Sequence, residues 1–443
     1  MQNQGIRDAR SLGTPKLLVL GLQHMFAMFG ATVLVPALTG LSVSATLLFA
    51  GLSTLFFHFL TKGKVPAFLG SSFAYLAGYA AIAPNGEAAL LPYACVGVAA
   101  SGLLYLILAA LVRGFGANRV MRFFPPVVTG PIIICIGMTL ANSAINNCTG
   151  SWDIALVAII TVVVFNIWGK GMLRIIPILL GVLVSYVYAA VTGRVDFSGV
   201  ASAAWIGLPV KMENTVFSLV GNCDVNLLVT AIIAIMPIAF ATMIEHIGDI
   251  CAISSTVGAN FIADPGLHRT LLGDGLATSI ASLFGAPANT TYGENTGVLA
   301  LTRVYDPLVI RLAAVYAIIA SFCPKFAALV SAMPTGTIGG VSLILYGMIS
   351  AIGVRNLVEN RVDLAKSRNV IVVSLIISLA LGITFSAAGA ITFHVGEFTL
   401  NFSGLAVAAI VGIVVNAILP GKDYDFQNDY EYGKTTEDHG QML

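Results

Sequence analysis

The sequence predicts an all-α polytopic membrane protein with about fourteen transmembrane segments, arranged as two inverted repeats of seven. Three observations favour this class: the composition, the spacing of the apolar runs, and an unequal distribution of Lys and Arg between alternate loops. Of the 443 residues, 57% are hydrophobic and 10% are charged, whereas a soluble domain is about 45–50% apolar and about 25% charged. A secreted enzyme and a disordered scaffold are therefore excluded, and the net charge of +1 predicts no nucleic-acid partner.

A helix that spans a bilayer needs about 20 mostly apolar residues. The apolar runs between polar breaks predict spans at 17–40, 43–61, 70–84, 88–112, 124–146, 153–169, 174–193, 226–248, 269–286, 291–302, 308–331, 334–353, 369–387 and 403–419.

The positive charges test this count, because Lys and Arg prefer cytoplasmic loops. With the N-terminus in the cytoplasm, nineteen Lys and Arg fall on the cytoplasmic side, and only Arg194, Lys211 and Lys325 fall on the other. Residues 1–16 lack the apolar stretch of a cleavable signal. We therefore expect a multi-pass protein with both termini in the cytoplasm: an N-terminal segment at 1–16 and an acidic, solvated tail at 421–443.

Two of the predicted segments, the third and the tenth, are too short to cross as full helices. Each follows a stretch rich in Pro and Gly, at 65–70 and 285–289. Short, interrupted segments at matching places in two halves indicate a transporter binding site. The halves also share weak similarities in the same order: Ser71-Ser72-Phe73 with Thr290-Thr291-Tyr292, Gln23-His24 with Glu245-His246, and the span opening at Pro125 with that opening at Pro334. An odd number of spans in each half inverts the second half in the membrane.

Glu245 and Glu294 fall inside predicted spans and Asp249 falls at the end of one, and an ionisable side chain inside a span costs about 2.5–3.5 kcal/mol on insertion scales. Glu245 and Asp249 share one helix face, and Glu294 lies in the short tenth segment. Short strands before the two half-helices leave free backbone N–H groups at Phe73 and Gly293. Together with the aromatic ring of Tyr292, these groups are typical of a site for a small planar polar solute, and a carboxylate there is able to exchange a proton.

Other interpretations of these residues remain open at this stage. Glu245 and Asp249 also fit a helix end at the membrane interface, and Glu294 fits a cap of a half-helix, where an acid is favoured by the helix dipole. His24 and Tyr346 also fit roles in packing. The six cysteines are scattered without a CxxC pair, which favours packing and predicts no metal site.

The residues Glu294 to Arg303 (Glu-Asn-Thr-Gly-Val-Leu-Ala-Leu-Thr-Arg) resemble the signature of the nucleobase/ascorbate transporter family. Gln23-His24, Gly70-Ser71-Ser72-Phe73 and the Glu245-His246-x-Gly248 run are similar to the same family, over nearly the whole chain, and to its uracil-transporting bacterial branch. The resemblance implies a proton symporter without another cofactor, not an enzyme. It implies a homodimer in the lipid of the bacterial inner membrane that moves uracil or a related nucleobase by an elevator mechanism.

The resemblance also implies a domain division. A core domain would comprise residues 17–123 (spans one to four) and 222–331 (spans eight to eleven). A gate domain would comprise residues 124–221 (spans five to seven) and 332–420 (spans twelve to fourteen).

By the same resemblance, substrate contacts would be the side chains of Glu245 and Glu294 and the backbone amides of Phe73 and Gly293. Second-shell or proton-coupling residues would be Asp249, Tyr292, Asn295, Tyr346 and His24. An acid at position 294 is typical of the pyrimidine branch. Position 249 departs from that branch, which usually has His there. A proton-coupled purine transporter of the xanthine type on the same fold is therefore the alternative.

Two hypotheses from other classes are weaker. An intramembrane enzyme would need a catalytic constellation, and the sequence contains no HExxH motif. A channel or anion exchanger would favour basic residues in the site, where this chain has acidic ones.

Overall fold

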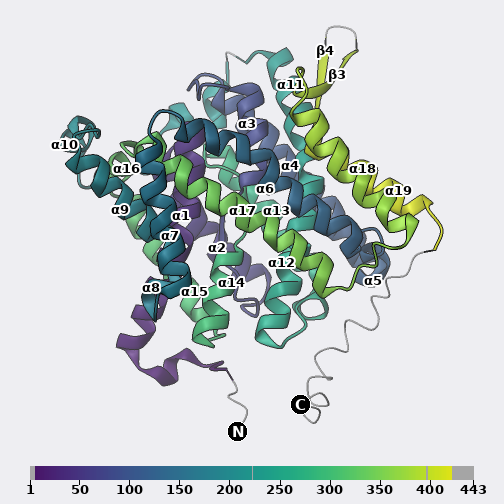
Figure 1. Ribbon diagram of the computed structural model, residues 1–443, viewed down its shortest axis with the longest axis horizontal. Coiled ribbons are helices and arrows are strands. Elements are labelled where there is room, and N and C mark those ends of the chain that lie inside the picture. Colours follow the sequence, from purple (N-terminus) through teal and green to yellow (C-terminus); the bar gives the residue numbers. More distant parts are fainter. Residues whose placement is uncertain (1–4, 222, 396–397, 422–443) are drawn as a thin grey trace.

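The computed structural model describes residues 5–221, 223–395 and 398–421, and it is mostly helical (Figure 1). The predicted acidic tail, from Lys422 onward, lies outside the described residues. The helices are α1 (Thr14–Thr39), α2 (Val43–Leu60), α3 (Leu76–Ile82), α4 (Leu91–Phe115), α5 (Ala117–Met121), α6 (Pro126–Cys148), α7 (Trp152–Trp168), α8 (Met172–Ile175), α9 (Pro177–Val191), α10 (Ser198–Ser202), α11 (Val225–Ile235), α12 (Ala239–Val257), α13 (Leu267–Leu283), α14 (Gly293–Thr302), α15 (Pro307–Ser321), α16 (Pro324–Ser331), α17 (Thr335–Glu359), α18 (Ser367–Thr384) and α19 (Gly404–Ile418). Short helical turns are η1 (Ala9–Leu12), η2 (Phe73–Tyr75), η3 (Met212–Asn214), η4 (Val216–Leu219), η5 (Met236–Ile238) and η6 (Ile262–Gly266).

Every predicted apolar range overlaps at least one of these helices. Within the described residues, seven helices are long and apolar enough to cross a membrane, or eight if one bent pair counts as a single span. Four further apolar helices have 10–17 residues. A polytopic membrane protein is therefore supported, while the count of fourteen spans stays a prediction.

One predicted span is divided by a sharp bend. The range 308–331 forms two helices, α15 and α16, that meet at an angle of 89°. Pro324 is the first residue of α16, and proline lacks the N–H group that a continuing helix would need at this position. The predicted apolar range 308–331 is therefore a bent pair of helices, and its count as one span stays a prediction.

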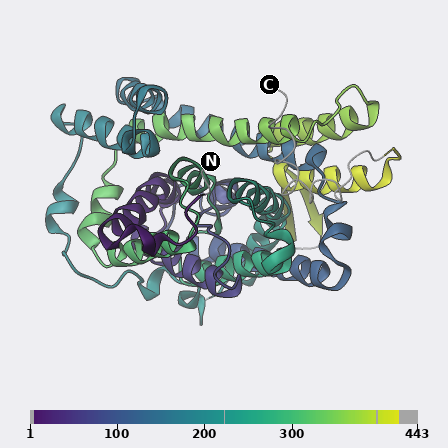
Figure 2. The ribbon, with the colours of Figure 1, turned by 90° about the horizontal axis from the view of Figure 1, so that it is seen from below.

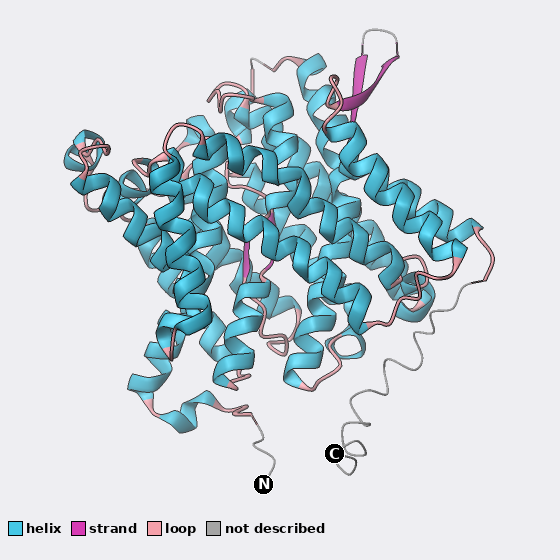
Figure 3. Ribbon diagram, viewed as in Figure 1, coloured by secondary structure: helices cyan, strands magenta, loops and turns pink. Residues whose placement is uncertain are grey.

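The fold is mostly helical and also contains strands, two of them where short strands are predicted before the two half-helices. β1 (Leu69–Ser71) and β2 (Asn289–Thr291) form an antiparallel pair, with Gly70 opposite Thr290. Figure 3 shows this pair at the centre of the helical bundle. A second, unpredicted hairpin, β3 (Ala390–Val395) with β4 (Phe398–Ser403), projects from the edge of the bundle between α18 and α19.

The helices form two packing groups, and each group contains contacts that join the two halves of the chain. In one group α4 packs against α13, α2 packs against α15, and β1 pairs with β2. In a second group α6 packs against α17, α7 against α9, and α18 against α19. Figure 2 shows α17 and α18 in green along one side of the molecule and α1 in purple on the other. The buried core is made mainly of Ala, Val, Ile and Leu side chains that fill the space between these helices.

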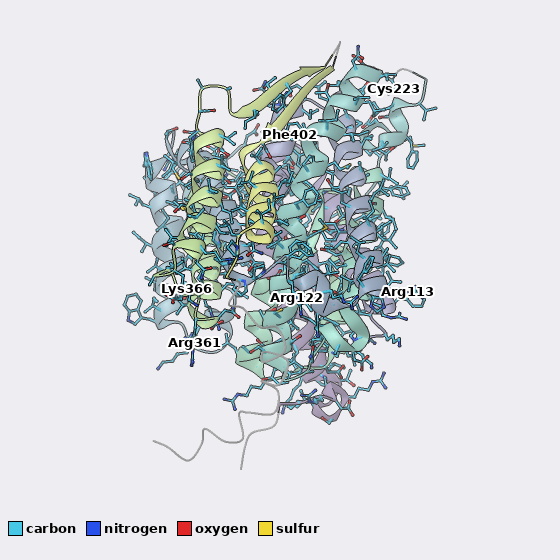
Figure 4. All side chains as sticks on the ribbon, turned by 90° about the vertical axis from the view of Figure 1, so that its right-hand side faces the viewer. Arg113, Arg122, Cys223, Arg361, Lys366 and Phe402 are labelled. Carbon is cyan, nitrogen blue, oxygen red and sulfur yellow. The ribbon has the colours of Figure 1, made fainter. Side chains whose placement is uncertain are left out.

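Charged side chains gather at one end of the bundle. Figure 4 shows Arg113, Arg122, Arg361 and Lys366 toward the lower end of the helices, and Cys223 and Phe402 toward the upper end. This distribution agrees with the asymmetry that the loop charges predict.

Candidate functional site

The paired strands position two short helices at the centre of the bundle. Ser72 donates its backbone N–H to the carbonyl oxygen of Ala288 (2.8 Å), and Tyr292 donates to that of Phe68 (3.0 Å), so the pairing continues past both strands. The chain then enters η2 and α3 after β1, and α14 after β2. Since antiparallel strands run in opposite directions, two helix N-termini lie beside the same small sheet. Each N-terminus carries unsatisfied N–H groups and a partial positive charge.

Tyr292 is a structural support for this arrangement. Its hydroxyl donates to the carbonyl oxygen of Ser71 (2.9 Å) and accepts from the hydroxyl of Thr32 on α1 (3.3 Å). Its ring lies directly over Gly70, where an added Cβ would come within 2.4 Å of Tyr292 Cζ. The hydroxyl of Tyr292 is thus engaged between β1 and α1, and its predicted place beside the substrate stays a prediction.

The two acids on α12 lie beside this sheet. Asp249 Oδ2 accepts a hydrogen bond from the hydroxyl of Thr291 on β2, at 2.7 Å. Oε2 of Glu245 is buried and has no hydrogen-bond partner among the described residues. An unpartnered buried carboxylate oxygen is costly, and in a binding protein such an oxygen is available to a ligand. This buried oxygen favours the interpretation of Glu245 as a ligand-binding acid over that of an acid at the membrane interface.

Gly293 and Glu294 begin α14, which packs against α12. Glu294 is therefore carried by a helix that packs directly against the helix of Glu245. Gly293 is the first residue of the helix, so its N–H has no acceptor inside α14. A Cβ added there would meet only Ile352 Cδ1, at 3.9 Å. The space on the side of Gly293 where a side chain would project is therefore not filled by a close neighbour.

Phe73 and Tyr346 form the aromatic part of the site. Phe73 is the first residue of η2, and its ring lies edge-on to that of Tyr346 on α17, with centroids 5.6 Å apart and an interplanar angle of 76°. The hydroxyl of Tyr346 is buried without a hydrogen-bond partner in the described part of the chain. α17 therefore contributes a polar group from the second packing group to a site built mainly by the first.

His24 and Asn295 lie together, as a second shell. Nδ2 of Asn295 donates to the backbone carbonyl oxygen of His24 at 3.1 Å and lies 3.2 Å from its Nδ1. Both side chains are fully buried. This contact ties α14 to α1 behind Glu294.

The sequence interpretation missed one pair of residues near the site. Asp274 on α13 and His246 on α12 are fully buried, and His246 Nδ1 lies 3.1 Å from Asp274 Oδ2. Glu245 also interacts electrostatically with Asp274. The signal was present, because Asp274 is an ionisable residue inside the predicted span 269–286, the same criterion that identified Glu245 and Glu294.

The arrangement can recognise a small flat molecule by complementary hydrogen bonds. For such a molecule, carboxylate oxygens of Glu245 and Glu294 would accept hydrogen bonds, the N–H groups of Phe73 and Gly293 would donate them, and Phe73 and Tyr346 would supply apolar ring surface. Within the residues that the structure describes, no group of three or more His, Cys, Asp or Glu side chains is arranged to hold a metal ion.

Comparisons with known proteins agree with this picture. A model of the Permease family matches residues 15–389. The chain is 42% identical to the uracil permease of Bacillus caldolyticus over 437 residues, covering 96% of each protein. It is 39% identical to the uracil permease of Bacillus subtilis over 451 residues, covering 99% of this chain and 98% of that protein. These relatives are named as permeases, not as enzymes.

A solved structure shares the fold. The transmembrane domain of the cyanobacterial bicarbonate transporter BicA superposes with a TM-score of 0.62, covering 94% of this chain and 100% of that one, at 13% sequence identity. A likeness at this identity concerns the fold alone. With the family match over most of its length and the two permeases at 42% and 39% identity, the chain belongs to the permease family of nucleobase/ascorbate transporters.

Proposed function

We propose that this protein takes up uracil across the bacterial inner membrane together with a proton. One observation supports this more than any other: Glu245 presents a buried carboxylate oxygen that has no hydrogen-bond partner in the described part of the chain, on a helix that packs against the helix carrying Glu294. Two relatives that span nearly the whole chain are named uracil permeases.

The hydrogen-bond pattern suits a pyrimidine. Uracil has two ring N–H donors and two carbonyl acceptors. Glu245 and Glu294 would accept from the ring N–H groups, and the backbone amides of Phe73 and Gly293 would donate to the carbonyl groups. Because Gly293 has no side chain and a Cβ there would meet only Ile352 Cδ1 at 3.9 Å, a ligand could approach this part of the backbone closely. Since the ligand's polar edge would be fully paired, an analogue with a different pattern would leave buried groups unsatisfied.

Asp249 is the proposed proton carrier of the site. It lies one helical turn from Glu245, and Thr291 already holds one of its oxygens. Protonation of Asp249 would remove one negative charge from a cluster that also contains Glu245, Glu294 and Asp274. Crowded carboxylates repel one another at low dielectric. Binding of a proton to Asp249 would reduce this repulsion, and we expect the site then to bind a neutral ligand more readily.

The matching helix contacts support the inverted repeat and the elevator mechanism. Under the repeat, α2 corresponds to α13 and α4 to α15, and the structure packs α4 against α13 and α2 against α15. The proposed core domain (17–123 and 222–331) contains the strand pair and the acids, and the proposed gate domain (124–221 and 332–420) contains α17 with Tyr346. Alternating access would move one group of helices against the other around the site. Fourteen spans, cytoplasmic termini and a homodimer in lipid belong to the same proposal.

Uptake by purified protein in proteoliposomes tests this function. With an inward proton gradient, we expect radiolabelled uracil to accumulate, and a protonophore to abolish the accumulation. Excess unlabelled xanthine or hypoxanthine should compete weakly. Strong competition by purines without uracil uptake would instead support the purine transporter, for which the aspartate at position 249 is the favouring observation. Accumulation of uracil that persists in the presence of the protonophore would contradict proton coupling.

A further inference from the structure

The first described residues make an unusual set of contacts with the helices that carry the site. Residues Gly5 to Gly13, here called the N-terminal strap, precede α1 and lie at the lower end of the molecule in Figure 1. Ile6 donates its N–H to the carbonyl oxygen of Arg303 and accepts from the N–H of Tyr305, both at 2.8 Å. The strap is thereby paired with the segment that follows α14, as a short parallel bridge.

Two further contacts extend this attachment. The backbone N–H of Ala9 donates to Asp306 Oδ2 at 2.8 Å, while Asp306 Oδ1 accepts from Leu308 and caps α15. The guanidinium of Arg7 donates to the carbonyl oxygen of Val257 at 2.8 Å. Val257 is the last residue of α12, so a cation at this carbonyl is also favoured by the helix dipole.

The strap therefore joins the C-terminal ends of α12 and α14. The strap pairs with Arg303, the residue that follows α14 and caps its C-terminal end. Arg303 has a φ of 55°, a left-handed conformation that is unfavourable for residues other than glycine. Hydrogen bonds to Arg303 and Tyr305, on both sides of Val304, hold this turn. Gly5 packs so closely on Tyr305 that an added Cβ would lie 2.1 Å from the ring.

We infer that the N-terminal strap is a positioning element of the substrate site: it fixes α12 relative to α14, and so fixes Glu245 relative to Glu294. This inference rests on the proposed function for the identity of the ligand. The two acids come from helices that meet over a short length, and a site for one small molecule needs both within hydrogen-bond reach. The strap and the contact of His24 with Asn295 hold α14 at two levels, one beyond its last turn and one in its first turn.

The test uses full-length protein with two matched variants. Arg7→Ala removes the contact with Val257, and Arg10→Ala removes the same charge from the same strap at an exposed side chain for which no contact with α12 is seen in the described residues. We expect Arg7→Ala to raise the KM for uracil uptake roughly tenfold, the equivalent of one charge-assisted hydrogen bond, with kcat changed less than about twofold. Arg10→Ala should behave as the wild type.

A second readout does not depend on the substrate. Spin labels at Ser255 and Leu301, near the ends of α12 and α14, report the distance between these helices. Arg7→Ala and a deletion of residues 5–11 should broaden the distance distribution, and Arg10→Ala should not. If the wild type fails to transport uracil but Arg7→Ala still broadens the distance distribution, the proposed function is wrong while the positioning role of the N-terminal strap is retained. The positioning role would be overturned if Arg7→Ala and the deletion both left the distance between the spin labels and the KM for uracil unchanged. A lower Tm with an unchanged KM in these two variants would also overturn it.

Discussion

The two short helices beside the central strands share a backbone arrangement but differ in chemistry. The first begins with Phe73-Ala74-Tyr75 and continues through α3 without a charged residue, whereas α14 begins with Gly293-Glu294-Asn295. Both follow a three-residue strand and both present backbone N–H groups. In the proposed site, backbone donors would therefore come from both halves of the chain, whereas both substrate-binding carboxylates would come from the second half, through α12 and α14.

Replacing an acid of the second half should have the largest effect. Glu294→Gln keeps the size of the side chain but removes its charge and introduces donors where the ligand also donates. We expect uracil binding to weaken about 100-fold or more, measured by equilibrium binding to purified protein. Glu87→Gln, after the first short helix and outside the site, should leave affinity unchanged. Equal affinity of Glu294→Gln and the wild type would remove Glu294 from the site.

Proton coupling should depend on the second half as well. Asp249→Asn retains an oxygen that can accept from Thr291 but cannot carry a proton. We expect gradient-driven accumulation of uracil to fall about tenfold or more, while exchange of internal for external uracil persists. Counterflow and gradient-driven uptake in the same proteoliposomes separate these two activities. Loss of both activities together would assign Asp249 to binding instead of coupling.

Substitutions at two glycines should distinguish a residue that supports the fold from a residue that contacts the substrate. Gly70→Ala would force a Cβ to within 2.4 Å of Tyr292 Cζ, so we expect a loss of about 1–3 kcal/mol in stability from overpacking, seen as a lower Tm. Gly293→Ala has room for its Cβ, with the nearest atom at 3.9 Å, and should keep the Tm while weakening uracil binding. If both variants lose stability to the same extent, the proposed difference between the two halves at these positions fails.

The smallest effect is expected at an exposed contact between the halves. Lys64, after α2, forms an ion pair with Asp264 in η6, and this hydrogen bond holds the pKa of Asp264 below its usual value. The pair therefore stabilises the protein above the ordinary aspartate pKa, and the stabilisation is lost as pH falls through the lowered value. Asp264→Asn should lower the Tm slightly at pH 7, less than Gly70→Ala does, because exposed pairs contribute little. The difference from the wild type should vanish in acid.

Much of the fold follows from local sequence properties. The apolar ranges overlap the helices because long apolar runs are the dominant signal in a membrane protein. The stretches at 65–70 and 285–289 predict the central strands, since Pro and Gly prevent a helix there. The β3–β4 hairpin was not predicted, although Ile391, Phe393 and Phe402 show the alternation of a strand. It lies between the predicted spans 369–387 and 403–419, where polar residues interrupt the apolar runs.

The candidate site was predictable wherever a single residue breaks a local rule. Glu245, Asp249 and Glu294 were found as charges within apolar runs, and Asp274 could have been found in the same way. The N-terminal strap could not, since its contacts join residues about 250–300 positions apart and no local pattern in residues 5–13 indicates a partner. The 89° bend at Pro324 was also missed, because the residues on both sides of it are apolar.

A structure with bound uracil tests the central claim most directly. The account predicts carboxylate oxygens of Glu245 and Glu294 within hydrogen-bond distance of the ring N–H groups, and the amides of Phe73 and Gly293 at its carbonyl oxygens. A ligand bound away from α12 and α14, or one whose ring N–H groups meet neither carboxylate, would contradict it.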